Sequence, residues 1–190
     1  MAKGIMFTEA IFNAVIEGRK TQTRRIVKPQ PHDFYIPNKL SIPRETSIDG
    51  AQGKSSRKFK PRYKLGEKVF IKEPYQYVGS PDAGIKYKYD NDSEINFIVG
   101  DLWKNKLFMP AKYARYFIEI TGVRCERLQD ISDEDCLSEG IVKTIDMVLR
   151  FDDIFNTPQQ AYAALINKIN GKGTWESNPY VWVYSFRLVK

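Results

Sequence analysis

The first regular pattern of apolar residues is helical and lies near the N-terminus. Thr8 is a suitable N-cap, and Gly18 stands where a left-handed residue ends a helix. The pattern therefore predicts a helix of about three turns between these two positions. The residues at helical spacing are Ile11, Phe12, Val15 and Ile16.

Two further helices are predicted in the second half of the chain. Ser132 is a candidate N-cap for a short helix that runs to about Glu139 and stops at Gly140. Thr157, followed by a proline and two glutamines, is a stronger start signal for a helix that ends at Gly171.

Alternating and β-rich stretches predict the strands. They cover residues 65–73, a hairpin over 75–89, 116–124 and a closing strand over 180–188. Strands interrupted by three short helices indicate an α+β domain built on a small mixed or closed β-sheet.

One long stretch has no period. Between about residues 30 and 62 the chain is basic and contains proline, glycine and serine, which indicates a functional or disordered insertion. Its lone His32 is interpreted as a surface residue. We therefore expect a single domain over residues 1–190 that carries this insertion.

Composition argues against membrane, secreted and metal-binding proteins. No apolar run is long enough for a membrane span and the N-terminus lacks the apolar core of a signal peptide, so we expect a cytoplasmic protein without membrane contact. Cys125 and Cys136 show no CxxC spacing, and there is one histidine. We expect two reduced, partly buried cysteines, no metal site and no cofactor.

The net charge of +7 is concentrated in one segment. Residues 19–72 hold fifteen Lys or Arg against four Asp or Glu, a local balance of +11, which leaves −4 for the rest of the chain. Such a segment favours contacts with phosphates. A lysine-rich solubilising loop would have the same composition.

The candidate chemistry lies at residues 18–25, Gly-Arg-Lys-Thr-Gln-Thr-Arg-Arg. Nearby cations and burial make a lysine less basic, so Lys20 could act as a base with Thr23 as nucleophile, given a carboxylate to orient the lysine. Serine-hydrolase, zinc-protease and phosphate-loop motifs are absent from the sequence. A binding patch is the alternative interpretation of the cluster.

The cluster Gly18-x-Lys20-x-x-x-x-Arg25 after a short helix resembles the signature of ASCH domains, relatives of the PUA RNA-binding fold. The resemblance covers nearly the whole chain apart from the insertion, and is to phage and bacterial members. The blocks that carry it are residues 20–25, 66–73, Met109-Pro110, 127–132, 139–141 and 175–183.

This resemblance implies a small PUA-like β-barrel with flanking short helices and a cleft for a nucleotide or RNA. Some more distant bacterial members are amidohydrolases that deacetylate N4-acetylcytidine with a lysine, a threonine and a glutamate. By position in the motifs these correspond to Lys20, Thr23 and Glu139. Arg25 would hold a phosphate or a carbonyl oxygen.

Further ligand contacts are predicted from charge and from aromatic stacking on a base. For the aromatic residues, core packing is the alternative, and for Trp182 it is the preferred interpretation. The predicted ligand-binding residues are Arg19, Arg24, Arg25, Glu73, Tyr75, Trp103 and Trp175.

Three functions follow as hypotheses. The first is recognition of RNA or a modified nucleotide in a basic cleft. The alternative is an amidohydrolase that acts on N4-acetylcytidine-like nucleosides. A phage-borne accessory protein whose basic patch contacts another protein is the third. The fold leaves the choice open because one fold hosts several functions.

Overall fold

We describe the protein from a computed structural model. The described residues are 2–30, 60–78, 84–90, 103–143, 148–150 and 153–189. The predicted insertion, with His32, falls almost wholly outside them.

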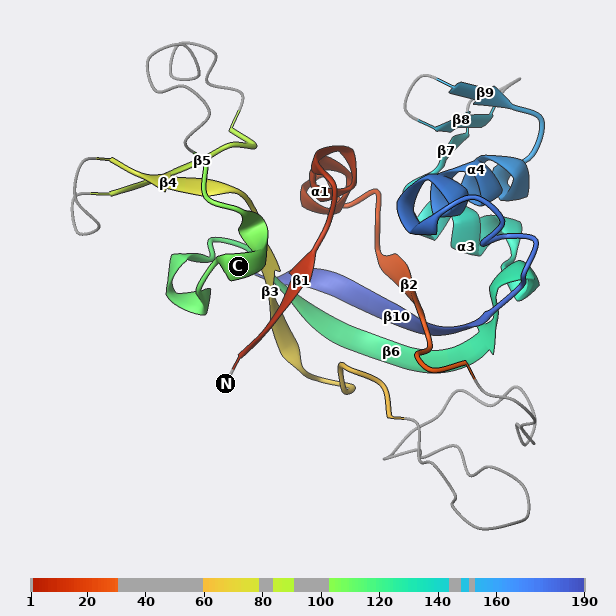
Figure 1. Cartoon of the computed structure of the whole chain (residues 1–190), viewed down its shortest axis with the longest axis horizontal. Helices are drawn as coiled ribbons and strands as arrows, with labels where there is room; N and C mark the ends of the chain where they lie inside the picture. Colours follow the sequence, from red (N-terminus) through yellow and green to blue (C-terminus); the bar gives the residue numbers. More distant parts are fainter. Residues whose placement is uncertain are drawn as a thin grey trace.

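A five-stranded mixed sheet forms the centre of the described structure (Figure 1). Its order is β1-β3-β6-β10-β2, in which β1 and β3 are parallel and every other pair is antiparallel. The strands are β1 (Lys3–Met6), β2 (Gln22–Ile26), β3 (Lys68–Lys72), β6 (Phe117–Arg127) and β10 (Tyr180–Val189).

The two long strands β6 and β10 determine the shape of the sheet. Along β6, Ile118 and Ile120 are buried while Thr121 is exposed, which is the alternation expected of a strand with one covered face. A bulge in the pairing lies between Ser185 and Phe186 of β10. Bulges increase local bending, and both strands curve strongly in Figure 1.

The structure confirms the α+β class with a mixed sheet and few helices. Among the described residues no ladder joins the edge strands β1 and β2, so closure into a barrel stays a prediction. The two edges are nevertheless linked, because Nη2 of Arg25 in β2 donates to the carbonyl of Met6 in β1 at 3.0 Å.

The three predicted helices are confirmed as α1 (Glu9–Ile16), α3 (Asp133–Ser138) and α4 (Pro158–Asn170). The side chains of Ser132 and Thr157 cap α3 and α4 by accepting from backbone N–H groups. Gly18 and Gly140 follow α1 and α3 with φ of 76° and 96°, a conformation that favours glycine. Figure 1 shows α3 and α4 together at one end of the sheet.

Smaller elements surround the sheet. The predicted hairpin is confirmed, and a three-stranded sheet that the sequence did not predict precedes α4. None of the described helices is long and apolar enough to cross a membrane. These elements are β4 (Tyr75–Tyr77), β5 (Ile85–Tyr87), β7 (Val142–Lys143), β8 (Val148–Arg150), β9 (Asp153–Phe155) and the 3₁₀ turns η1 (Lys106–Phe108), η2 (Ala111–Tyr113) and η3 (Leu128–Asp130).

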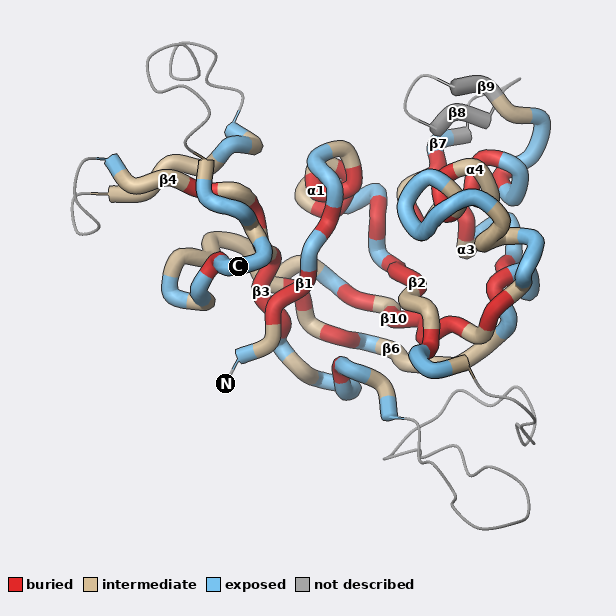
Figure 2. Tube along the Cα trace, in the orientation of Figure 1, coloured by how far each residue is buried: buried red, intermediate tan, exposed pale blue. Residues whose placement is uncertain are grey.

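Buried residues run along the sheet and the facing sides of α1, α3 and α4 (Figure 2). Trp182 is buried in this core, as predicted. Cys136 is buried and Cys125 is half-buried, and both are free thiols. Burial raises the pKa of each thiol to about 12, so both are protonated at neutral pH.

The first prediction tests the core. Replacing Ile120, which is 1% exposed, by alanine removes buried methyl groups and leaves a cavity, so we expect a loss of about 2–5 kcal/mol in the free energy of unfolding. The matched control is the exposed neighbour Thr121→Ala, which we expect to change it by about 0.5 kcal/mol or less. Urea unfolding of both variants measures the difference, and similar losses would contradict the assigned faces of β6.

Candidate functional site

Lys20 is placed by two backbone contacts to segments far apart in the sequence. After α1 the chain turns at Gly18, and the amide of Lys20 donates to the carbonyl of Ala14 at 2.9 Å. The amide of Thr21 donates to the carbonyl of Ser138, the last residue of α3, at 2.9 Å. The start of β2 is thereby held between the ends of α1 and α3.

Glu139 directly follows α3 and meets Lys20 there. Nζ of Lys20 donates to the backbone carbonyl of Glu139 at 2.9 Å and also to its carboxylate Oε2. The two residues are 2% and 4% exposed. The structure thus brings together the predicted base and the predicted carboxylate, which are 119 positions apart.

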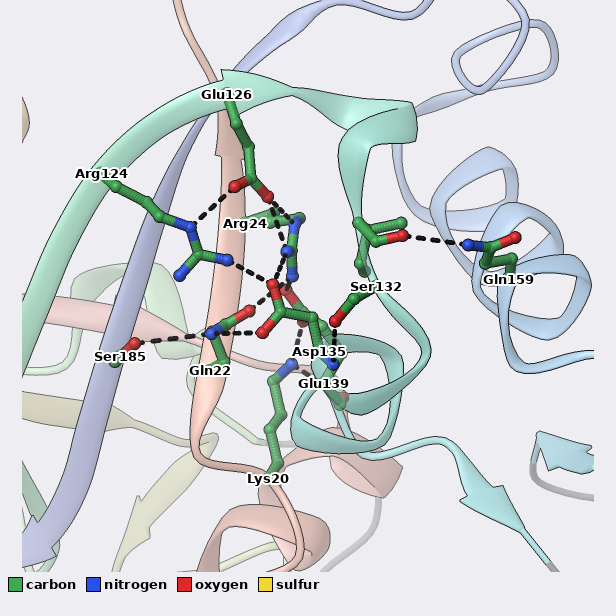
Figure 3. Close-up of polar contacts among 11 residues, drawn as sticks. Lys20, Gln22, Arg24, Arg124, Glu126, Ser132, Asp135, Glu139, Gln159 and Ser185 are labelled. Atoms are coloured by element: carbon green, nitrogen blue, oxygen red, sulfur yellow. Dashed lines mark hydrogen bonds and ion pairs between the residues drawn. The ribbon is translucent and has the colours of Figure 1, made fainter. Parts of the chain in front are cut away.

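Arg24 links the same carboxylate to the sheet (Figure 3). Its side chain is fully buried and lies within 3.2 Å of Oε1 of Glu139, 2.7 Å of Glu126 and 2.6 Å of Asp135. It also donates to the side-chain oxygen of Gln22 at 2.7 Å. Its donors are therefore occupied by groups of the protein itself.

Charges in this cluster balance. Arg124 on β6 pairs with Glu126 at 2.7 Å and with Asp135. Although burial alone would lower the pKa of Arg24, the carboxylates of Glu139 and Glu126 raise it above its ordinary value. Three cations, Lys20, Arg24 and Arg124, thus face three carboxylates, Glu126, Asp135 and Glu139.

The pKa of Lys20, in contrast to that of Arg24, is lowered. Burial is the main cause, and the positive charges of Arg25 and Arg24 act in the same direction. The carboxylate of Glu139 opposes the shift by stabilising the ammonium form. A lysine with a lowered pKa is a better proton acceptor near neutral pH than an exposed lysine.

A cavity of about 190 Å³ lies over Lys20 and Glu139. The end of β1, helix α1, the first part of β2, η1 and helix α4 all contribute to its wall. Its lining residues are Met6, Phe7, Thr8, Ile11, Lys20, Thr23, Arg24, Arg25, Lys106, Glu139, Tyr162, Leu165, Ile166, Ile169 and Asn170.

Two buried hydroxyl groups in this wall have no hydrogen-bond partner among the described residues. Thr23 on β2 is 2% exposed and Tyr162 on α4 is 1% exposed. Burial raises the pKa of Tyr162 well above its ordinary value, and the charge of Glu139 adds to the effect. Buried hydroxyls usually have a hydrogen-bond partner. Since these two have none among the described residues and belong to the cavity wall, both could bind a molecule in the cavity.

Five of the sequence-predicted site residues line the cavity. They are Lys20, Thr23, Arg24, Arg25 and Glu139. Of these, Arg24 was predicted to contact a ligand, but its donors are committed to internal carboxylates. It is therefore placed to position Glu139.

The other predicted contacts do not line the cavity. Arg19 lies at the surface and pairs with Glu17 at 2.5 Å. Glu73 is buried and accepts two hydrogen bonds from one edge of the Arg115 guanidinium, from Nε at 2.9 Å and from Nη2 at 2.7 Å. These two residues have structural partners in place of a ligand.

The predicted aromatic contacts also lie elsewhere. Tyr75 is buried among other tyrosines, with its ring 5.8 Å from that of Tyr77. Trp103 is half-buried and does not line the cavity. Trp175 packs edge-on against Tyr162, with 6.2 Å between ring centroids, and thus supports the wall from behind.

Tyr162 and Lys106 are among the wall residues that sequence reasoning did not predict as site residues. Tyr162 was assigned only to the apolar face of its helix, which is correct for its ring but leaves out its hydroxyl. Lys106 follows a stretch without a clear hydrophobic period, and no motif in its neighbouring sequence marks it as a site residue. Both are recognised only from their place in the cavity.

No group of three His, Cys, Asp or Glu side chains within the described ranges is arranged to hold a metal ion. The carboxylates near the cavity are instead bound by arginine and lysine. The polar groups that line the cavity are hydrogen-bond donors and acceptors, among them Lys20, Thr23 and Glu139.

Comparison with protein families, with curated proteins and with solved structures finds nothing that matches this chain.

The second prediction concerns Arg24. Arg24→Met removes the buried cation that Glu126, Asp135 and Glu139 share and leaves these three carboxylates with only two cations, so we expect a loss of about 3–5 kcal/mol in the free energy of unfolding. The matched control is Arg187→Met, whose side chain is 68% exposed and pairs with Glu119, with an expected loss of about 1 kcal/mol or less. Equal losses in denaturant unfolding would show that the Arg24 cluster is not a buried network.

Proposed function

We propose that this protein is an amidohydrolase of the ASCH type, which removes the acyl group from the exocyclic amine of an N4-acetylcytidine-like nucleoside or nucleotide. The observation that carries the proposal is the buried pair of Lys20 and Glu139 in the same cavity wall as the unpartnered hydroxyl of Thr23. These are the three residue types, in the three positions, that the resemblance to the amidohydrolases singles out.

Lys20 is the general base in this proposal. Its pKa is lowered by burial, which makes it a stronger candidate for accepting a proton than an exposed lysine, and Glu139 holds the nitrogen by accepting a hydrogen bond. Arg24 holds the other oxygen of the same carboxylate at 3.2 Å. The base is thus fixed from two sides before any ligand enters.

The reaction is acyl transfer to water. Lys20 accepts a proton from Thr23 or from a water molecule as the oxygen attacks the acyl carbon. The resulting ammonium then gives its proton to the departing exocyclic nitrogen as the carbon–nitrogen bond breaks. If Thr23 attacks, water hydrolyses the ester in a second round, and acetate and the free amine leave.

Tyr162 supplies a donor for the acyl oxygen. Its high pKa keeps the phenol protonated at neutral pH, and its hydroxyl has no competing partner among the described residues. A fixed, buried donor stabilises the negative charge that develops on the carbonyl oxygen. From the sequence, Arg25 was the residue expected to hold a phosphate or a carbonyl oxygen.

The cavity size fits one small group. About 190 Å³ is below the roughly 300–1,000 Å³ of most small-molecule pockets. A single acylated base therefore fills it, and the sugar lies at the mouth. The apolar side chains of Ile11, Leu165 and Ile166 suit the flat faces of a base.

The finer fold assignment belongs to the same proposal. The signature residues 18–25 form the turn after α1 and most of β2, and so supply much of the cavity wall. This placement supports a PUA-like architecture in which the mixed sheet, bridged from Arg25 to Met6, closes toward a barrel.

Recognition of RNA without chemistry is the second candidate. It is favoured by the concentration of positive charge in residues 19–72 and by the cations in the cavity wall. Binding of this kind weakens steeply with salt, whereas hydrolysis of an uncharged nucleoside scarcely responds to it.

The third prediction tests the enzyme directly. Purified protein incubated with N4-acetylcytidine should release cytidine, and Lys20→Met and Thr23→Val should each lower the rate by about a hundredfold or more. The matched control is Thr121→Val, an exposed threonine on β6, which should retain the wild-type rate. Absence of turnover, together with salt-sensitive RNA binding, would favour the recognition candidate. Normal turnover by Thr23→Val would instead assign the attack to water.

The fourth prediction uses pH. The rate should rise as Lys20 loses its proton, with a midpoint below the ordinary lysine pKa of 10.5. Because Glu139 raises the pKa of Lys20, Glu139→Gln should move this rising limb to lower pH while reducing the maximal rate. A limb that stays in place would show that another group titrates. Circular dichroism spectra across the pH range verify that the variant is folded.

A further inference from the structure

Two cations in the cavity wall differ from those of the buried cluster. Arg25 and Lys106 both line the cavity, yet within the described part of the chain neither forms an ion pair with a carboxylate. Lys20 and Arg24, by contrast, are neutralised by acidic side chains. The charge balance of the wall is therefore positive at Arg25 and Lys106.

The two side chains donate to the carbonyl groups of successive residues. Arg25 donates to the carbonyl of Met6 at 3.0 Å, and Nζ of Lys106 donates to the carbonyl of Phe7. Successive Cα atoms are about 3.8 Å apart, so these contacts bring two cations from separate elements to the same short segment. The Arg25 guanidinium also lies 5.7 Å from the ring centroid of Phe7.

Both side chains keep donors for a further partner. A guanidinium has five N–H donors and an ammonium has three. Among the described residues, the hydrogen bonds of Arg25 use one donor, and those of Lys106, to Phe7 and the hydroxyl of Tyr89, use two. Burial is the main reason that the pKa of Lys106 is lowered, and Glu9 opposes it. An anion beside Lys106 would favour its charged form.

We propose that Arg25 and Lys106 form a phosphate subsite at the mouth of the cavity, and that the natural ligand is a nucleotide monophosphate. Arg25 binds two phosphate oxygens through its planar edge, and Lys106 contributes a point charge. The neutral interior receives the base and the mouth receives the phosphate. The chemical class of the substrate, but not the subsite itself, rests on the function proposed above.

Equilibrium binding tests the subsite without requiring turnover. Calorimetry with the full chain compares cytidine, cytidine 5′-monophosphate, cytidine 3′-monophosphate and tetracytidylate. We expect at least one monophosphate to bind about tenfold or more tightly than cytidine, because a charged hydrogen bond contributes about 1.5–3 kcal/mol. Equal affinity for cytidine and both monophosphates would overturn the proposal. Much tighter binding of the tetramer than of either monophosphate would replace it with recognition of a strand.

Variants of Arg25 and Lys106 separate the effect of positive charge on phosphate binding from the effect of a hydrogen-bond donor. Lys106→Gln and Arg25→Gln keep a hydrogen-bond donor but remove the charge, and each should lower the monophosphate-to-cytidine affinity ratio by about tenfold. Lys106→Arg restores the charge and should restore most of the ratio. Lys112→Gln changes an exposed lysine outside the cavity wall and should leave the ratio as in the wild type.

The outcomes distinguish this proposal from the preceding one. A preference for the monophosphate that survives both glutamine variants overturns the subsite, whatever the catalytic activity. A preference that these variants abolish establishes the subsite even if N4-acetylcytidine is not hydrolysed. Thermal unfolding of each variant verifies that a lost preference is not a lost fold.

Discussion

The buried guanidinium of Arg24 is the constraint on which the site depends. A charge fully removed from water is stable only when carboxylates surround it, and here they come from β6 and from α3 with the residue that follows it. Satisfying Arg24 therefore requires α3 to dock against β2 in one position. That position places Glu139 beside Lys20, and so a structural requirement also aligns the two groups that we assign to proton transfer.

The wall of the cavity contains two electrostatic environments. In its interior, the cations are paired with carboxylates and the groups share hydrogen bonds. The pKa of Lys20 therefore depends on several neighbouring charges and responds to small changes in their positions. At the segment Met6–Phe7, the cations donate to carbonyl and hydroxyl oxygens, and among the described residues they form no ion pair with a carboxylate. A ligand with an uncharged base and an anionic phosphate is complementary to this arrangement, because each part meets the environment that it requires.

Local signals predicted much of the fold and part of the site. Caps and glycines located α1, α3 and α4, and alternation located β6 and β10. Strand β2 was missed because Gln-Thr-Arg-Arg is polar at positions that the sheet buries, and only distant carboxylates make that burial possible. For the same reason Arg24 was predicted to be a ligand contact. Lys106 and the hydroxyl of Tyr162 had no local signal, since their role arises from the packing of η1 and α4 around the cavity.

Glu139 holds Lys20, the base in our proposal, without raising the pKa of Lys20 above its ordinary value. A glutamate bound only to Lys20 would stabilise the ammonium form and raise its pKa. Glu139, however, gives one oxygen to Lys20 and the other to Arg24, whose positive charge also acts on Lys20 directly and lowers its pKa. Arg24 thus offsets part of the effect of the carboxylate that it holds in place. The cluster orients the lysine while the pKa of Lys20 stays below its ordinary value, and the general-base role that we propose requires both conditions.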